Sequence, residues 1–147
     1  RVIIIDPFFT TKELFDFVLA IQSPVDVTII TSKDVMNRRS ELKGESSTET
    51  IGDEIYTQIL NLKGELIGHK IEIKVMTGKK PFIHDRFLII DDEVWFSGNS
   101  LNNIGNRLSM LIRLPNPDEI LDILKELESN PERRIETMEE WKNKRER

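Results

Sequence analysis

The alternation of apolar and polar positions near the start of the chain predicts a strand, a helix and a second strand. Val2 to Ile5 is an uninterrupted run of β-branched residues, and Val25 to Thr31 is a second, similar stretch. Such runs are typical of strands that are covered on both faces. Between them, apolar residues recur at helical spacing before Pro24: Leu14, Val18 and Ile21. This order predicts a βαβ unit with a parallel sheet.

The middle of the chain predicts a loop, a helix and a half-exposed strand. The stretch 32–50 is polar and predicts a loop or the frayed start of a helix. Between Ile51 and Leu62, apolar residues recur at helical spacing, which predicts an amphipathic helix. The segment from Lys70 to Met76 alternates isoleucine and valine with charged residues. This alternation predicts a strand with one face exposed.

The rest of the chain predicts a hairpin, a further strand and a helix. Phe87–Ile90 and Glu93–Ser97 are strand-like segments that the turn residues Asp91-Asp92 separate. After a loop rich in asparagine and glycine, residues 107–114 predict another strand. Asn116, with proline next in the sequence, is typical of the start of a helix.

Taken together, these elements predict an α/β fold: a mixed sheet with helices on both faces. We expect residues 1–130 to form the domain and residues 131–147 to form a charged helical tail. The sequence begins with Arg1 rather than methionine. We therefore expect the chain to be a fragment of a longer protein with additional domains.

The composition narrows the class of protein and its compartment. The 147 residues include no cysteine, which excludes a disulfide framework or a thiolate zinc site and fits a cytoplasmic location. No apolar run approaches membrane-spanning length, so we expect no membrane partner. The formal net charge is -5. Because nucleic acid is bound largely through phosphate neutralisation, such binding would need a local basic patch, for which the candidates are Lys79, Lys80 and Arg107.

The two histidines limit the acid–base chemistry that the chain can perform. His69 precedes a predicted strand, and we interpret it as a surface residue. His84 lies at the start of the most apolar strand, and the alternation of a strand places Arg86 beside it on the same face. A neutral imidazole can act as a nucleophile or base, and a guanidinium can hold an anion through two hydrogen bonds.

A polar loop follows the hairpin, which would return the loop beside His84. The loop residues could donate uncharged hydrogen bonds to an oxyanion: Gly98, Asn99, Ser100 and Asn102. Lys80 lies on the turn that precedes the histidine. A nucleophile, a cation and polar donors together indicate a site for a phosphoryl group.

The segment from His84 to Asp91, HDRFLIID, resembles the motif of the phospholipase D superfamily. That motif consists of His-x-Lys, four residues, Asp, six residues and then Gly-Ser-x-Asn. The histidine, the aspartate and Gly98 are in register with it. Three positions differ from the lysine, serine and asparagine of the family, namely Arg86, Asn99 and Leu101 in turn.

The resemblance implies a phospholipase D-like α/β fold, a mixed sheet with helices on both faces. It also implies an activity and a mechanism. In this family one histidine attacks phosphorus, a second protonates the leaving oxygen, and no metal or other cofactor is needed. It therefore implies a phosphodiesterase in which His84 is the nucleophile and, from the other subunit of a homodimer, the general acid. Arg86 would hold the phosphate oxygens, and Asp91 would support the catalytic group. Because the small single-motif members are mostly nucleases, nucleic acid is the expected substrate.

Three other interpretations stay open. A catalytically degenerate phospholipase D-like module could bind nucleic acid, a ligand or a protein partner, and the changed Gly-Ser-x-Asn region favours this. A metal-dependent phosphohydrolase is suggested by His84 and Asp85, although the further histidines that such sites recruit are missing. Alternatively, His84 and Arg86 could form only a structural ion pair with Asp85 or Asp91.

Overall fold

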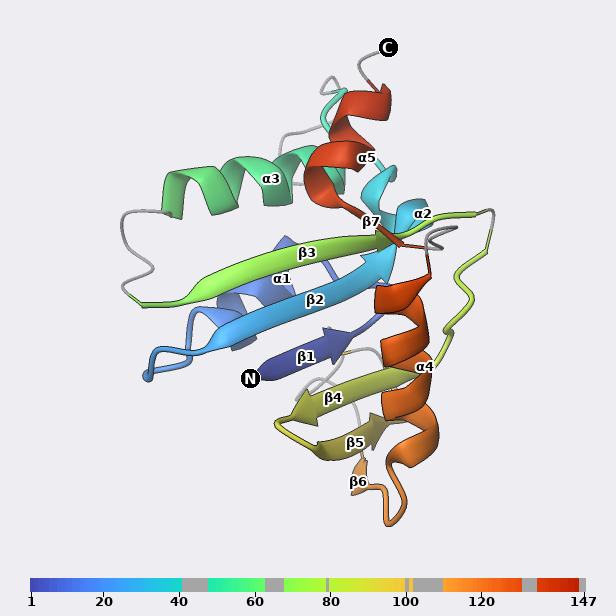
Figure 1. The fold of residues 1–147 in the computed structure, drawn as a ribbon. Helices are drawn as coiled ribbons and strands as arrows, with labels where there is room; N and C mark the ends of the chain where they lie inside the picture. Colours follow the sequence, from blue (N-terminus) through green and yellow to red (C-terminus); the bar gives the residue numbers. More distant parts are fainter. Residues whose placement is uncertain are drawn as a thin grey trace.

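A seven-stranded mixed sheet organises the chain (Figure 1). The computed structural model describes residues 1–40, 48–62, 68–78, 80–99, 101, 110–130 and 135–145. The strands are β1 (Val2–Ile5), β2 (Asp26–Ser32), β3 (Lys70–Met76), β4 (Arg86–Ile90), β5 (Glu93–Ser97), β6 (Leu111–Arg113) and β7 (Ile135–Thr137). Their order across the sheet is β6-β5-β4-β1-β2-β3-β7, so the first strand of the chain lies at the centre.

The strand directions follow the predicted connections. β1, β2 and β3 run parallel to one another, as expected where helical segments connect successive strands. β4 is antiparallel to β1, and β5 and β6 continue from it as antiparallel neighbours. The predicted βαβ beginning and the hairpin around Asp91-Asp92 are therefore confirmed.

Helices cover both faces of the sheet. They are α1 (Thr11–Glu13), the π-helix η1 (Leu14–Val18), α2 (Lys33–Met36), α3 (Ile51–Leu62), α4 (Asp118–Ser129) and α5 (Met138–Arg145). Leu124 and Leu127 of α4 belong to the core on one face, whereas Ile55 of α3 belongs to the core on the other. The predicted class, α/β with a mixed sheet and helices on both faces, is confirmed. Within the described ranges, no helix is long and apolar enough to cross a membrane.

Three segments differ from the sequence prediction. The polar stretch 32–50 contains α2, because the Ser32 hydroxyl caps this short helix by accepting a 3.2 Å hydrogen bond from the Val35 N–H. The first predicted helix is a short α1 continued by η1, in which the Leu19 N–H donates to the Leu14 carbonyl, five residues back. The strand predicted over 107–114 is observed as β6, and residues 102–109 lie outside the described residues.

Residues 135–145 pack into the same sheet and core as the preceding elements. Ile135–Thr137 form β7, antiparallel to the second half of β3, so the charged helical tail predicted over 131–147 begins its described part with a strand and continues as α5. A strand forms here because it satisfies backbone groups along the outer edge of β3. The Thr137 hydroxyl accepts from the Glu140 N–H at 3.2 Å, and the Glu140 carboxylate accepts from the Thr137 N–H at 2.7 Å. This reciprocal cap starts α5.

Trp141 holds α5 against the first turn of α3. Its side chain is 1% exposed, and its Nε1–H donates a 3.3 Å hydrogen bond to Oδ1 of Asn37, just after α2. A Cβ atom on Gly52 would lie 2.3 Å from Cη2 of the indole. Glycine at this position therefore leaves the space that the tryptophan ring fills.

We expect Gly52→Ala to lower the free energy of unfolding by about 1–3 kcal/mol, because the added methyl group overlaps the buried indole. Urea denaturation followed by circular dichroism measures the change. The matched control is Gly98→Ala, where no described atom lies within 4 Å of the added Cβ. Equal stability of Gly52→Ala and the native chain would contradict this packing.

Asp53 gives the same interface a charged component. Its carboxylate accepts hydrogen bonds from the Thr50 N–H at 3.1 Å, from the Thr50 hydroxyl at 2.8 Å and from Nη1 of Arg145 at 3.0 Å. Partial burial by itself raises the pKa of Asp53, but these hydrogen bonds outweigh it and the pKa is lowered. The carboxylate therefore stabilises the fold in its ionised form.

We expect Asp53→Asn to lower the free energy of unfolding by about 1–2 kcal/mol near pH 7. A carboxylate with a lowered folded-state pKa contributes stability above its unfolded-state pKa of about 3.8, and this is lost as the pH falls through the folded-state value. Urea titrations from pH 7 to pH 2 should therefore show the difference shrinking in acid. Asp122→Asn, which removes an exposed ion pair with Lys125, is the control. A difference that stayed constant with pH would disprove the assignment.

Candidate anion-binding site

The end of β1, the start of β4 and the end of β5 lie together at one end of the sheet, where these strands begin or terminate. β1 ends at Ile5, which pairs with Phe87 near the start of the antiparallel β4. Arg86, the first residue of β4, pairs with Ser97 at the end of β5. The segments that follow β1 and β5 and the segment that precedes β4 therefore lie close together, although they are far apart in the sequence.

A buried carboxylate connects two of these segments. Asp6 has no exposed surface, and its Oδ1 accepts a 2.9 Å hydrogen bond from the Phe8 N–H. Its Oδ2 accepts a 2.8 Å hydrogen bond from the Leu101 N–H. Such bonds offset the cost of removing a carboxylate from water. Asp6 therefore fixes the loop after β5 against the end of β1.

Three basic side chains contact the phenyl ring of Phe8: Arg38, His84 and Arg86. These four residues are here called the Phe8 cluster. The Arg86 Cζ lies 5.0 Å from the phenyl centroid and the Arg38 Cζ lies 5.9 Å from it, both within the range of cation–π attraction. The His84 ring meets the phenyl ring edge-on, with centroids 5.9 Å apart and an interplanar angle of 76°. The aromatic ring thus gathers three basic side chains at this end of the sheet.

The two arginines of the cluster differ in their partners. Arg38 donates a 2.9 Å hydrogen bond to the exposed Asp34 carboxylate, one helical turn earlier. Among the described residues, Arg86 makes no ion pair, and its Nε is buried with no hydrogen-bond partner. His84 is exposed. The ion pair with Asp85 or Asp91 is therefore not observed for Arg86, and the guanidinium is available to an anion.

The structure brings together part of the predicted site. His84 and Arg86 belong to the Phe8 cluster, and Gly98 and Asn99 directly follow the Ser97 that pairs with Arg86. The Ser97 hydroxyl donates a 2.7 Å hydrogen bond to the Asn99 carbonyl, which shapes this turn. Lys80 is exposed on the connection between β3 and β4. Four predicted residues lie outside the described residues: Lys79, Ser100, Asn102 and Arg107.

Asp91 does not belong to this group. It follows the opposite end of β4, and five residues of strand separate the two ends by roughly 16 Å. Its carboxylate accepts a 2.8 Å hydrogen bond from the amino group of Arg1, which lowers the pKa of Asp91. The extended strand therefore places Asp91 away from the Phe8 cluster, and the supporting role that the phospholipase D resemblance implies for it stays a prediction.

Sequence reasoning missed Phe8 and Arg38. An aromatic residue just past the end of a buried parallel strand lies at the edge where ligands bind to α/β sheets, which is a usable signal for Phe8. Arg38 lies in a polar stretch and offers no pattern. Its position depends on α2 and on the neighbouring Asn37, which accepts the hydrogen bond from Trp141. Within the described ranges, no group of three or more histidine, aspartate or glutamate side chains is placed to hold a metal ion.

The chain's similarity to known proteins extends to a solved structure. No protein-family model matches it, and no curated protein matches it. Among solved structures, it is similar to TrmBL2, described as an archaeal chromatin protein with a novel mode of DNA binding, at 17% identity and a TM-score of 0.41. The alignment covers 85% of this chain and 40% of that one. A similarity of this degree carries no argument about function.

The open space around Gly98 allows a test of whether a bound anion lies against the backbone at this residue. Its φ is not positive, and no described atom lies within 4 Å of an added Cβ, so the fold does not require glycine. We expect Gly98→Ala to change the free energy of unfolding by less than about 0.5 kcal/mol. If an anion lies against this backbone, Gly98→Val should weaken its binding several-fold at unchanged stability. Inorganic phosphate, titrated by NMR, is the probe, and equal binding by both variants and the native chain would remove Gly98 from the site.

Proposed function

We propose that the chain binds a phosphodiester, most favourably of a nucleic acid, at the Phe8 cluster. The observation that carries this proposal is Arg86, a partly buried cation held on an aromatic face with no carboxylate partner among the described residues. Burying part of a guanidinium without a counter-ion costs free energy. An anionic ligand whose two oxygens accept hydrogen bonds from the other N–H groups of Arg86 would offset this cost.

The neighbouring groups favour a phosphate over a carboxylate as the ligand. Arg38 and His84 lie against the same phenyl ring as Arg86, so three basic groups contact one aromatic side chain. A phosphodiester presents several oxygens to such a set, and the polar turn at Gly98 and Asn99 adds uncharged groups. The resemblance of residues 84–98 to the phospholipase D motif supports the same ligand class. The net charge of -5 means that attraction must be local.

Hydrolysis through His84 is the second candidate. The observation in its favour is that the imidazole is exposed and contacts the same phenyl ring as Arg86. His69 cannot assist His84, because it precedes β3. Since β3 is parallel to β1, it begins at the end of the sheet opposite to the Phe8 cluster. The second histidine of the proposed mechanism would come from a second copy of the chain, in a homodimer.

We expect Arg86→Gln to weaken binding of a fluorescein-labelled oligonucleotide by about 10–100-fold, because a charge-assisted contact is lost. Arg38→Gln should have a smaller effect, since Arg38 is shared with Asp34. Fluorescence anisotropy at fixed ionic strength, with single- and double-stranded DNA and RNA, measures the affinity. Lys125→Gln on the exposed side of α4 is the charge-matched control. No binding, or equal losses in Arg86→Gln and the control, would refute the proposed site.

Cleavage of the same oligonucleotides in EDTA separates the two candidates. Catalysis predicts product from the native chain, none from His84→Ala, and a bell-shaped pH profile from a coupled histidine pair. Binding without product in the native chain would identify a binding module. Product that disappears on addition of EDTA alone would contradict the histidine mechanism.

A further inference from the structure

The outer edge of β3 is only half covered. β7 pairs with Lys74, Val75 and Met76, and α5 then leads the chain away from the sheet. Within the described part of the chain, no strand lies beside Lys70–Ile73 on this side. The outward backbone N–H and C=O groups of these residues form a template on which another extended segment can pair.

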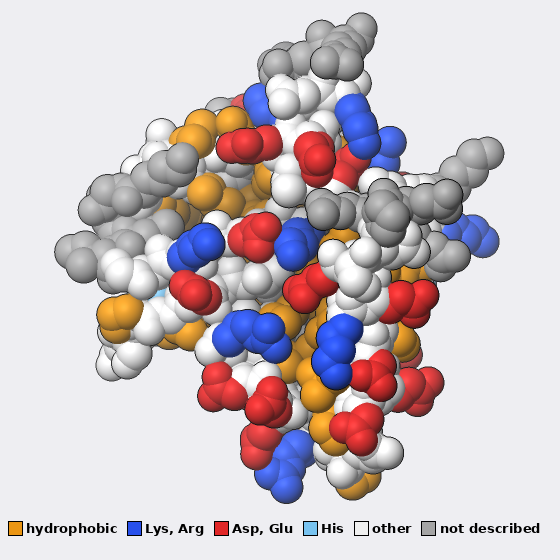
Figure 2. Space-filling model, in the orientation of Figure 1, with side chains coloured by type: hydrophobic (Ala, Val, Ile, Leu, Met, Phe, Trp, Pro, Cys, Tyr) orange, Lys and Arg blue, Asp and Glu red, His pale blue; other side chains and the backbone are white. Residues whose placement is uncertain are grey.

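A cavity lies on each side of this open half-edge. The first, of about 320 Å³, lies between α3, β3 and α5 and is mainly apolar; its apolar lining is Tyr56, Ile59, Leu60, Ile71, Ile73 and Met138. Figure 2 shows hydrophobic surface exposed beside α3. The second, of about 290 Å³, lies on the α4 side of the sheet and is polar. Glu72 and Thr137 line both cavities, so the two flank the same edge.

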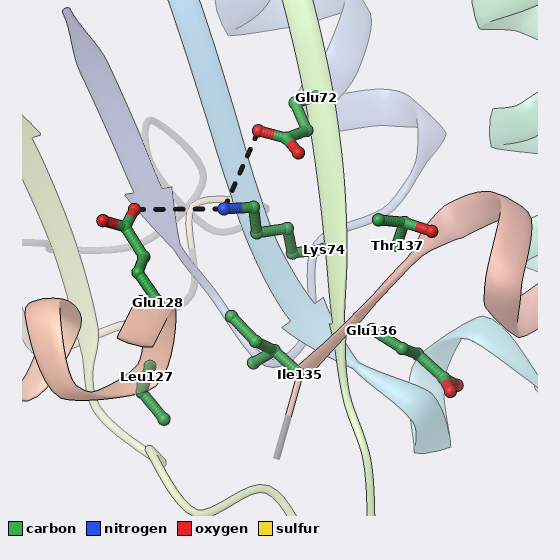
Figure 3. Close-up of a pocket in the computed structure, with 7 residues that line it drawn as sticks. All are labelled: Glu72, Lys74, Leu127, Glu128, Ile135, Glu136 and Thr137. Atoms are coloured by element: carbon green, nitrogen blue, oxygen red, sulfur yellow. Dashed lines mark ion pairs between the residues drawn. The ribbon is translucent and has the colours of Figure 1, made fainter. Parts of the chain in front are cut away.

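Carboxylates dominate the polar side of this edge. Lys74 lies between two glutamates, with its Nζ 3.8 Å from Glu72 and 3.9 Å from Glu128 (Figure 3). Glu136 also lines this cavity and pairs with Lys144. Glu139, at the start of α5, lines the apolar cavity beside them. With the exposed Lys70, three lysines lie among these four glutamates, and the edge keeps a net negative charge that favours a cationic partner.

We propose that Lys70–Ile73 bind an extended peptide segment of a partner protein, with an apolar–basic–apolar sequence, as an additional strand. Side chains directly opposite one another in a sheet lie on the same face. Residues opposite Ile71 and Ile73 would therefore enter the apolar cavity beneath α3. The residue between them would lie opposite Glu72, on the side of Glu128 and Lys74. Backbone pairing supplies affinity, and the two cavities supply the sequence preference.

The test uses a labelled peptide, Gly-Ile-Lys-Ile-Lys-Ile-Gly, and fluorescence anisotropy with the intact chain. We expect Glu72→Lys to weaken binding by about tenfold, since an opposite-charge pair becomes a like-charge pair. Glu119→Lys, an equal charge change at an exposed residue near the start of α4, should leave affinity within about twofold. A peptide with glutamate in place of lysine should bind more weakly to the native chain. NMR should show shifts at the amides of Ile71 and Ile73.

Two further outcomes overturn the proposal. A peptide that is N-methylated at alternate residues cannot complete the backbone ladder, so equal binding of this peptide means electrostatic attraction without strand addition. No binding of the unmodified peptide at millimolar concentration, or a stable dimer of the chain itself formed through this edge, also rejects it. Unfolding curves of Glu72→Lys and Glu119→Lys, compared with the native chain, establish that both variants are folded.

Discussion

The pairing of β1 with two neighbours of opposite direction determines the rest of the structure. β1 runs parallel to β2 on one side and antiparallel to β4 on the other. The end of a parallel βαβ unit therefore meets the beginning of a hairpin at one edge of the sheet. The hairpin brings the turn after β5 beside Arg86, and the pairing of β4 with β1 adds Asp6, which is far earlier in the sequence.

The candidate site has an unusual way of positioning positive charge. Arg86 is held by the face of Phe8 rather than by a carboxylate among the described residues. A carboxylate partner would neutralise the guanidinium and compete with a ligand, whereas an aromatic ring orients it without removing its charge. Asp6, which also lies at this end of the sheet, is buried and accepts hydrogen bonds from backbone N–H groups. Asp6 therefore fixes the backbone, while the Arg86 guanidinium keeps its charge in a chain that is acidic overall.

Much of the fold could be predicted from the sequence because strands covered on both faces need continuous apolar runs, as in Val2–Ile5. The alternation over Lys70–Met76 was equally informative. β7 was missed because three residues carry no readable period, and its existence depends on the free edge of β3. In the site, the alternation of a strand predicted that His84 and Arg86 lie near each other, and both contact Phe8. It could not reveal Arg38, whose contact with Phe8 depends on tertiary packing, or the distance that β4 puts between Arg86 and Asp91.

The hydrogen bond from Leu101 to Asp6 joins residues 95 positions apart. Contacts of such long range form late in folding, because closing a long loop is entropically unfavourable until other contacts hold its ends. During synthesis, β1 can pair with β2 early, but its other edge stays open until β4 has left the ribosome. For that period β1, a strand made entirely of apolar residues, presents an unpaired edge, which is the kind of surface that chaperones recognise and that aggregates recruit. The central position of β1 therefore makes the nascent chain most vulnerable before residue 90 emerges.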